Sequence, residues 1–160
     1  MNRIGFGFDS HRFVEGRPLR LCGITLEHPR GLAGHSDGDA ALHAVMDAMF
    51  GAAGMADIGE QFPDTDPRFK DADSAALLSE AVGMLVQMGW AVANCDITIV
   101  AEQPHLGPHK LAMRDRVAEL LGLDMACVSV KAKTAEGLGL IGSGEALAAF
   151  AVVLVEEATE

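Results

Sequence analysis

The 160-residue sequence contains no tyrosine, a single tryptophan and only 5% aromatic residues. Basic residues are also scarce, since 12 lysines and arginines stand against 23 acidic residues and the formal net charge is -11. Proteins that bind nucleic acids use cationic surfaces for the phosphates and aromatic rings for the bases. We therefore expect no nucleic acid partner. An anionic small molecule is still compatible with the acidic charge, because bound metal ions can neutralise it locally.

Cysteine is rare as well. Cys22, Cys95 and Cys127 are far apart, lie in or beside apolar segments, and form no CxxC pair. This pattern is typical of reduced thiols in the core of a cytosolic protein. The alternatives are a thiolate nucleophile or a sulfur-rich zinc site.

Long hydrophobic runs are absent. The N-terminal segment lacks an uninterrupted apolar stretch and reaches Asp9 at once, which does not fit a secretory signal. The longest apolar run, Ala146–Val155, is well short of the roughly 20 residues that a membrane helix needs. We expect a soluble, cytoplasmic protein that does not bind membranes.

The length and the 49% hydrophobic content predict one domain, residues 1–160, with a substantial core. Leu42, Val45, Met46 and Met49 have the spacing of a buried helical stripe. Loops are expected over Gly31–Gly38, 62–67 and Gly137–Gly144. The predicted elements run strand, strand, helix, helix, strand, helix, strand, strand, over Arg3–Asp9, Leu19–Leu26, Ala40–Ala53, Ser74–Met88, Ala91–Ala101, Lys110–Leu121, Cys127–Lys133 and Glu145–Glu156.

This order favours an α+β sandwich in which helices cover one face of a mixed β-sheet. Ala146–Val155 is apolar at consecutive positions, so both of its faces are expected to be buried. Its second face could be covered by the sheet of a neighbouring subunit, which favours an oligomer.

Asp9 and His11 are two residues apart and project to the same side of a strand. With His43 they would supply the three protein ligands of a catalytic zinc site that keeps a fourth position open. Asp39 and Asp47, one turn from His43, could accept its other ring N–H. The alternatives are a carboxylate and histidine that merely end a strand, and a boundary histidine paired with acidic neighbours.

The segment His35-Ser36-Asp37-Gly38-Asp39 precedes the first predicted helix, where free backbone N–H groups favour an anion. Ser36, Asp37 and Asp39 are candidate N-caps, and capping alone would also explain the segment.

Lys131, Lys133 and Thr134 could hold a diphosphate, and Glu136 could hold a hard cation such as Mg²⁺ between its phosphates. Lysines that protect a strand edge are the structural alternative. The glycines that follow suit either close approach to a ligand or an ordinary tight turn.

The order of these motifs resembles the 2-C-methyl-D-erythritol 2,4-cyclodiphosphate synthase family along essentially the whole chain. The similar segments are RIGFGFDSH near the start, HSDGDAALH at 35–43, DIGEQFPDTDP at 57–67 and KAKTAE at 131–136. The resemblance implies conversion of 4-diphosphocytidyl-2-C-methyl-D-erythritol 2-phosphate to the 2,4-cyclodiphosphate, with release of CMP, in the non-mevalonate isoprenoid pathway. It also implies a homotrimer with active sites between subunits.

The resemblance further implies the roles of individual residues. Asp9, His11 and His43 correspond to the zinc ligands, and Glu136 to a carboxylate at a second divalent ion, Mg²⁺ or Mn²⁺. His35 and Thr134 correspond to the pair that stabilises the transition state. The implied substrate contacts are Ser10, Ser36, Asp57, Ile58, Gly59, Phe62, Pro63, Asp64, Thr65, Asp66, Ala101, Glu102, Gln103, Pro104, His105, Leu106, Gly107, Ala132, Lys133, Ala135, Leu140 and Ser143.

The chain departs from the family pattern at a few positions. Leu140 and Ser143 stand where an aromatic residue and an arginine are usual, so an anionic lipid in the trimer channel is not expected with the usual contacts. His105 replaces a common lysine of the cytidine pocket, which weakens one contact at neutral pH.

Two other functions fit the residues. A zinc-dependent phosphohydrolase would use the same three ligands to activate water and would give an acyclic product. An oligomeric scaffold or ligand carrier would keep the histidines as structural residues and would bind no stoichiometric zinc.

Overall fold

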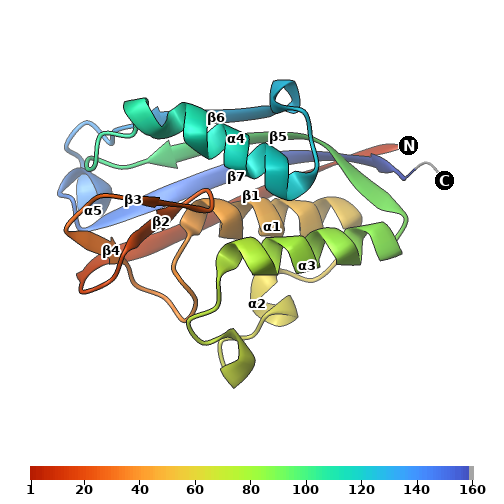
Figure 1. Cartoon of the computed structure of the whole chain (residues 1–160), viewed down its shortest axis with the longest axis horizontal. Helices are drawn as coiled ribbons and strands as arrows, with labels where there is room; N and C mark the ends of the chain where they lie inside the picture. Colours follow the sequence, from red (N-terminus) through yellow and green to blue (C-terminus); the bar gives the residue numbers. More distant parts are fainter. Residues whose placement is uncertain (159–160) are drawn as a thin grey trace.

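The computed structural model describes residues 1–158 and contains a five-stranded sheet with its main helices on one face (Figure 1). The strand order is β4-β1-β7-β5-β6, and every neighbouring pair is antiparallel except β5 and β6, which are parallel. The predicted mixed sheet is therefore confirmed. The bounds of its strands are β1 Asn2–Glu15, β4 Arg30–Leu32, β5 Trp90–Val100, β6 Val128–Lys133 and β7 Ala146–Glu157.

Three longer helices cover the sheet. Helix α1 (Ala40–Ala53) packs on β1 and β7, α3 (Ser74–Gln87) on α1 and β5, and α4 (Lys110–Leu121) on β6. Among residues 1–158, no helix combines the length and apolar composition needed to cross a bilayer. The short helical segments are α2 Ile58–Gln61, α5 Gly139–Gly142, η1 Pro67–Phe69, η2 Gly107–His109 and η3 Met125–Cys127.

Helix α1 has the predicted bounds. The sequence predicted one buried stripe along this helix, but the helix is buried on more than one side. Nearly all its side chains are inaccessible, because the sheet covers one side and α3 another. Asp39, one of the candidate N-caps, takes that role by accepting a hydrogen bond from the N–H of Leu42. The same carboxylate accepts hydrogen bonds from the N–H groups of Cys22 and Gly23, which ties an earlier turn to the start of the helix.

Several predicted boundaries need correction. β1 extends far beyond Asp9, because its second half pairs with β4 and with the start of β7. The strand predicted over Leu19–Leu26 is a hairpin, β2 (Leu19–Leu21) and β3 (Ile24–Leu26), with positive φ angles of 53° at Cys22 and 75° at Gly23.

Short regular segments also occur where loops were predicted. β4 includes the start of the loop predicted over Gly31–Gly38, and α5 lies within Gly137–Gly144. α2 was not predicted at all. The other predicted helices and strands are shifted by one residue or less.

The sheet face opposite the helices is apolar and open in the single chain. Ile4, Phe6 and Phe8 of β1 are 71%, 62% and 50% exposed, and Val152 of β7 is 42% exposed. The prediction that both faces of β7 are buried therefore holds within one chain only for the helix-covered face.

Two of the three cysteines occupy the core, as predicted. Burial raises the pKa of the Cys22 thiol well above its ordinary value and that of Cys95 to about 12. Such thiols are poor nucleophiles, because the thiolate is the reactive form. Cys127 is half-buried at the end of η3, just before β6.

Candidate functional site

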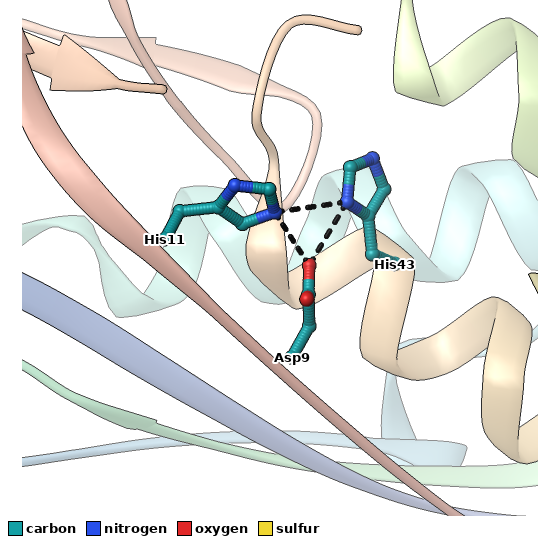
Figure 2. A group of neighbouring side chains, drawn as sticks. All are labelled: Asp9, His11 and His43. Atoms are coloured by element: carbon teal, nitrogen blue, oxygen red, sulfur yellow. Dashed lines mark hydrogen bonds and ion pairs between the residues drawn. The ribbon is translucent and has the colours of Figure 1, made fainter. Parts of the chain in front are cut away.

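The three predicted metal ligands converge between β1 and α1 (Figure 2). Nε2 of His11 lies 2.7 Å from Oδ2 of Asp9 and 3.3 Å from Nδ1 of His43. Nδ1 of His43 lies 2.9 Å from the same Oδ2 atom. One carboxylate and two imidazoles therefore point at a common centre, and all three side chains are half-buried.

Two glycines of β1 allow this convergence. Asp9 and His11 lie on the side of β1 that faces α1, where Gly5 and Gly7 also lie. A Cβ atom would be 1.7 Å from the carbonyl oxygen of Ala48 at Gly5, and 1.9 Å from that of Ala44 at Gly7. Only glycine permits so close an approach of strand and helix, and this approach brings His43 within reach of Asp9.

The three donor atoms lie close enough together to hold one metal ion. Ligand atoms about 2.0–2.1 Å from a tetrahedral zinc ion lie roughly 3.3 Å from one another. The separation of 3.3 Å between the two histidine nitrogens has this value, and both contacts to Asp9 are somewhat shorter, as hydrogen bonds are. Two histidine nitrogens that face each other and one carboxylate oxygen form a donor set that a cation satisfies.

The electrostatics of the cluster agree with cation binding. Burial alone would raise the pKa of the Asp9 carboxyl, but hydrogen bonds and charge from His11 and His43 lower it from 3.8 to about 2. For His11, burial acts to lower the pKa, but the hydrogen bond to Asp9 and its charge outweigh burial and raise the pKa. Asp9 is thus held as an anion, the form that binds a metal.

The outer nitrogens of both histidines have protein partners. Nδ1–H of His11 donates to the carbonyl oxygen of Ala33, which leaves the lone pair of Nε2 for a metal. Nε2 of His43 lies 2.9 Å from Oγ of Ser74 and 3.1 Å from Oγ of Ser36.

The predicted partners of His43, Asp39 and Asp47, are wrong. Asp39 is fully buried as the cap of α1, and Asp47 accepts a hydrogen bond from the backbone N–H of Ile58. Both carboxylates are one helical turn from His43, but they accept hydrogen bonds from backbone N–H groups instead. The observed partners of the His43 ring are the hydroxyls of Ser36 and Ser74.

A cavity of about 480 Å³ opens beside the cluster, which is within the usual size of small-molecule sites. The three metal ligands line this cavity. It is also lined by predicted site residues of the HSDGDAALH and DIGEQFPDTDP segments, namely His35, Ser36, Ile58, Gly59, Phe62 and Asp64. Gly34, Phe69 and Leu77 line it too and were not predicted. Leu77 has the spacing of a core residue of α3, so the sequence gives no sign that it lines the site. Phe69, in contrast, closely follows the predicted DIGEQFPDTDP segment.

The loop that carries His35 and Ser36 is held from two sides. The guanidinium of Arg17 donates to the carbonyl oxygens of Gly34 and Ser36. On the other side, the carbonyl oxygen of His35 accepts the N–H of Asp71, and the His35 ring contacts the carbonyl oxygen of Asp66 at 3.2 Å. The loop therefore has a fixed position at the mouth of the cavity.

A second, smaller cavity of about 160 Å³ lies elsewhere on the chain, where β5 and β6 end. Lys110 and Thr134 line it together with eight of the predicted substrate contacts, namely Ala101, Glu102, Pro104, His105, Leu106, Gly107, Ala132 and Lys133. His35 and Thr134, predicted as a pair, thus line different cavities of one chain. The parallel pairing of β5 with β6 brings the two segments of this cavity together.

The side chain of Glu102, which lines the second cavity, accepts hydrogen bonds from the backbone. Its Oε1 accepts the backbone N–H of Ala135 at 2.6 Å and that of Gly137 at 3.5 Å. The carboxylate thus links the segment after β5 to the segment after β6, which carries Thr134 and Glu136. Glu136 itself is exposed and has a φ angle of 52°.

The remaining predicted contacts line neither cavity. Asp57 is the N-cap of α2, Asp66 binds Arg68, and the side chain of Ser10 lies on the exposed side of β1. Ser143 is exposed and donates to the carbonyl oxygen of Leu140. The other four are Pro63, Thr65, Gln103 and Ala135.

The chain matches the YgbB family over residues 2–156. A 2-C-methyl-D-erythritol 2,4-cyclodiphosphate synthase from Gemmatimonas aurantiaca is 54% identical over 153 residues, which are 96% of this chain and 92% of the relative. A solved structure of a synthase of that name, in a form bound to CDP, superposes with a TM-score of 0.89 and 42% identity, and the match covers 96% of this chain and all of the other.

The bifunctional IspDF of Campylobacter jejuni superposes with a TM-score of 0.94 and 43% identity over 98% of this chain, which corresponds to 42% of that longer protein. The similarity extends through every element that carries the cluster and both cavities. The chain therefore belongs to the YgbB family, as a homologue of the 2-C-methyl-D-erythritol 2,4-cyclodiphosphate synthases.

Proposed function

We propose that this protein converts 4-diphosphocytidyl-2-C-methyl-D-erythritol 2-phosphate to 2-C-methyl-D-erythritol 2,4-cyclodiphosphate and CMP, in the non-mevalonate isoprenoid pathway. The observation that carries the proposal is the cluster of Asp9, His11 and His43 beside the larger cavity, in a chain of this family. The cytoplasmic location expected from the sequence stays a prediction.

Asp9, His11 and His43 would hold a zinc ion, with one coordination position left for the substrate. When bound, such an ion acts as a Lewis acid that polarises phosphoryl oxygens. The chain's own residues perform the positioning. Ser36 and His35, at the fixed mouth of the cavity, would orient phosphate oxygens.

The 2-phosphate of the substrate is the nucleophile, and it attacks the β-phosphorus while CMP departs. The protein therefore needs no nucleophile of its own, which agrees with the buried, weakly acidic thiols of Cys22 and Cys95. Its task is to fold a flexible polyanion back on itself and to stabilise the charge at phosphorus.

The proposed assembly is a homotrimer, in which the second cavity of one subunit completes the metal-side cavity of its neighbour. Two observations support it. His35 and Thr134 line separate cavities of one chain, although the family resemblance implies that they act as a pair on the transition state. The apolar side chains of Ile4, Phe6 and Phe8 form a face that a second subunit would cover.

Glu136 would hold a second divalent ion, Mg²⁺ or Mn²⁺, between the phosphates. We expect Glu136→Gln to shift the Mg²⁺ or Mn²⁺ concentration for half-maximal activity upward by about tenfold, because a neutral amide binds hard cations weakly. A metal titration of initial rates measures this shift. Glu145→Gln, at an exposed carboxylate near the start of β7, serves as the matched control, and an unchanged titration of the Glu136 variant would contradict the assignment.

Incubation with the cytidyl substrate tests the function directly. We expect equal amounts of CMP and cyclic product by ³¹P NMR. An acyclic phosphate would instead identify a phosphohydrolase, and substrate that stays intact in zinc-containing protein would indicate a carrier.

A further inference from the structure

We propose that Ser74 and Asp37 form a hydrogen-bond relay that fixes the ring of His43 with Nδ1 directed at the metal. Both are positioning residues, since they act through His43 and line neither cavity. The inference rests on the proposed metal centre and extends it to residues outside the ligand set.

The relay consists of three groups in series. Nε2 of His43 lies 2.9 Å from Oγ of Ser74, and that hydroxyl donates in turn to Oδ1 of Asp37. The backbone N–H of Ser74 donates to the other carboxylate oxygen at 3.0 Å. Ser74 is fully buried, so no water competes for its hydroxyl.

The direction of these hydrogen bonds follows from their chemistry. An ionised carboxylate can only accept, so the single hydroxyl proton of Ser74 points at Asp37. The lone pairs of its oxygen then face His43, whose Nε2 must carry the proton. In a neutral imidazole the other nitrogen, Nδ1, is then unprotonated and free to bind a metal.

Ser36 is the competing partner, at 3.1 Å from the same nitrogen. Its oxygen also lies 3.5 Å from the backbone nitrogen of Gly38, and no carboxylate within residues 1–158 orients its hydroxyl proton. The Ser36 hydroxyl can therefore turn toward a ligand in the cavity, whereas that of Ser74 has one orientation only.

Asp37 is itself held in place. Its Oδ1 accepts the N–H of Asp39 at 3.1 Å, and Oδ2 lies 3.8 Å from Nε of Arg20. The Arg20 guanidinium is anchored by a hydrogen bond of 2.8 Å to Thr25 of β3. The β2–β3 hairpin therefore supports the carboxylate that orients Ser74, and through it the metal ligand.

Zinc affinity tests the relay without an activity assay. Ser74→Ala and Asp37→Asn are expected to weaken zinc binding about 10- to 100-fold in competition with a fluorescent chelator, the usual effect of losing an outer partner of a ligating histidine. The control is Ser79→Ala on the same helix, whose hydroxyl donates to the carbonyl oxygen of Ala75. Its affinity should equal that of the unchanged protein.

NMR supplies a readout that needs no variant. In long-range ¹H–¹⁵N spectra of the zinc-loaded protein, we expect the His43 proton on Nε2 and slow exchange of that proton with water. In Ser74→Ala the exchange should become fast. Zinc bound through Nε2, or a rapidly exchanging proton in the unchanged protein, would overturn the relay even if both variants failed to fold.

The outcomes of these experiments distinguish a failure of the proposed relay from a failure of the proposed metal centre. If the unchanged protein takes up no zinc, the proposed metal centre and the relay both fail. If it takes up zinc and the folded Ser74→Ala and Asp37→Asn variants bind equally tightly, the relay alone is wrong.

Discussion

Replacing His43 with alanine is expected to abolish zinc uptake and cyclisation together. Alanine leaves Asp9 and His11 with one position of the ligand triangle empty, and two ligands from one strand hold zinc poorly. Loss of a metal that contributes several kcal/mol to the transition state lowers turnover by roughly a thousandfold or more. Stoichiometric metal analysis and CMP release measure the two effects.

The fold should survive this change, because His43 is one of the few half-buried side chains of a helix that is otherwise buried. His28→Ala is the matched control: it removes another half-buried imidazole, which packs on Phe13 away from the cavity. The control should keep its zinc and its rate. Normal cyclisation by zinc-free His43→Ala protein would refute the role given to this residue.

The second large effect is expected at Gly7. In Gly7→Ala the new Cβ would lie 1.9 Å from the carbonyl oxygen of Ala44, a backbone atom that cannot turn aside. Helix α1 must move away from β1 or the chain must fail to fold. We expect a loss of about 3 kcal/mol or more in the free energy of unfolding, measured by urea denaturation.

Any folded fraction of this variant should also bind zinc weakly, because a displaced α1 carries His43 away from Asp9. Gly51→Ala on α1 is the control, since its Cβ would meet nothing within 4 Å. Alanine favours helix, and the control should gain about 0.5–1 kcal/mol. A Gly7→Ala variant as stable as this control would show that strand and helix are less tightly packed than the distances indicate.

The long helices were predictable from sequence because their periodicity and boundary residues agree. For α1 and α4 the predicted bounds coincide with those observed. The hairpin at Cys22 was missed because its turn has a non-glycine residue with positive φ, so only Gly23 marks it. β4 was missed because a strand of three residues has no readable alternation and exists by pairing with β1.

The residue types and the spacing of Asp9 and His11 indicated candidate ligands, and the resemblance of their motifs to the family completed the set with His43. The outer partners of His43 were not predictable. Asp39 and Asp47 have the right spacing for His43, but Asp39 caps α1 and Asp47 accepts the backbone N–H of Ile58. Ser74, 31 residues beyond His43, reaches it only because α3 packs beside α1.

β1 presents opposite chemistries on its two sides, with Asp9 and His11 under the helix and Phe6 and Phe8 on the open face. A slip of one residue against β7 would exchange these sets, since neighbouring side chains point to opposite faces. Misaligned chains would thus lose metal uptake and the proposed subunit contacts at once. Zinc content can therefore serve as a quality measure for refolded preparations of this protein.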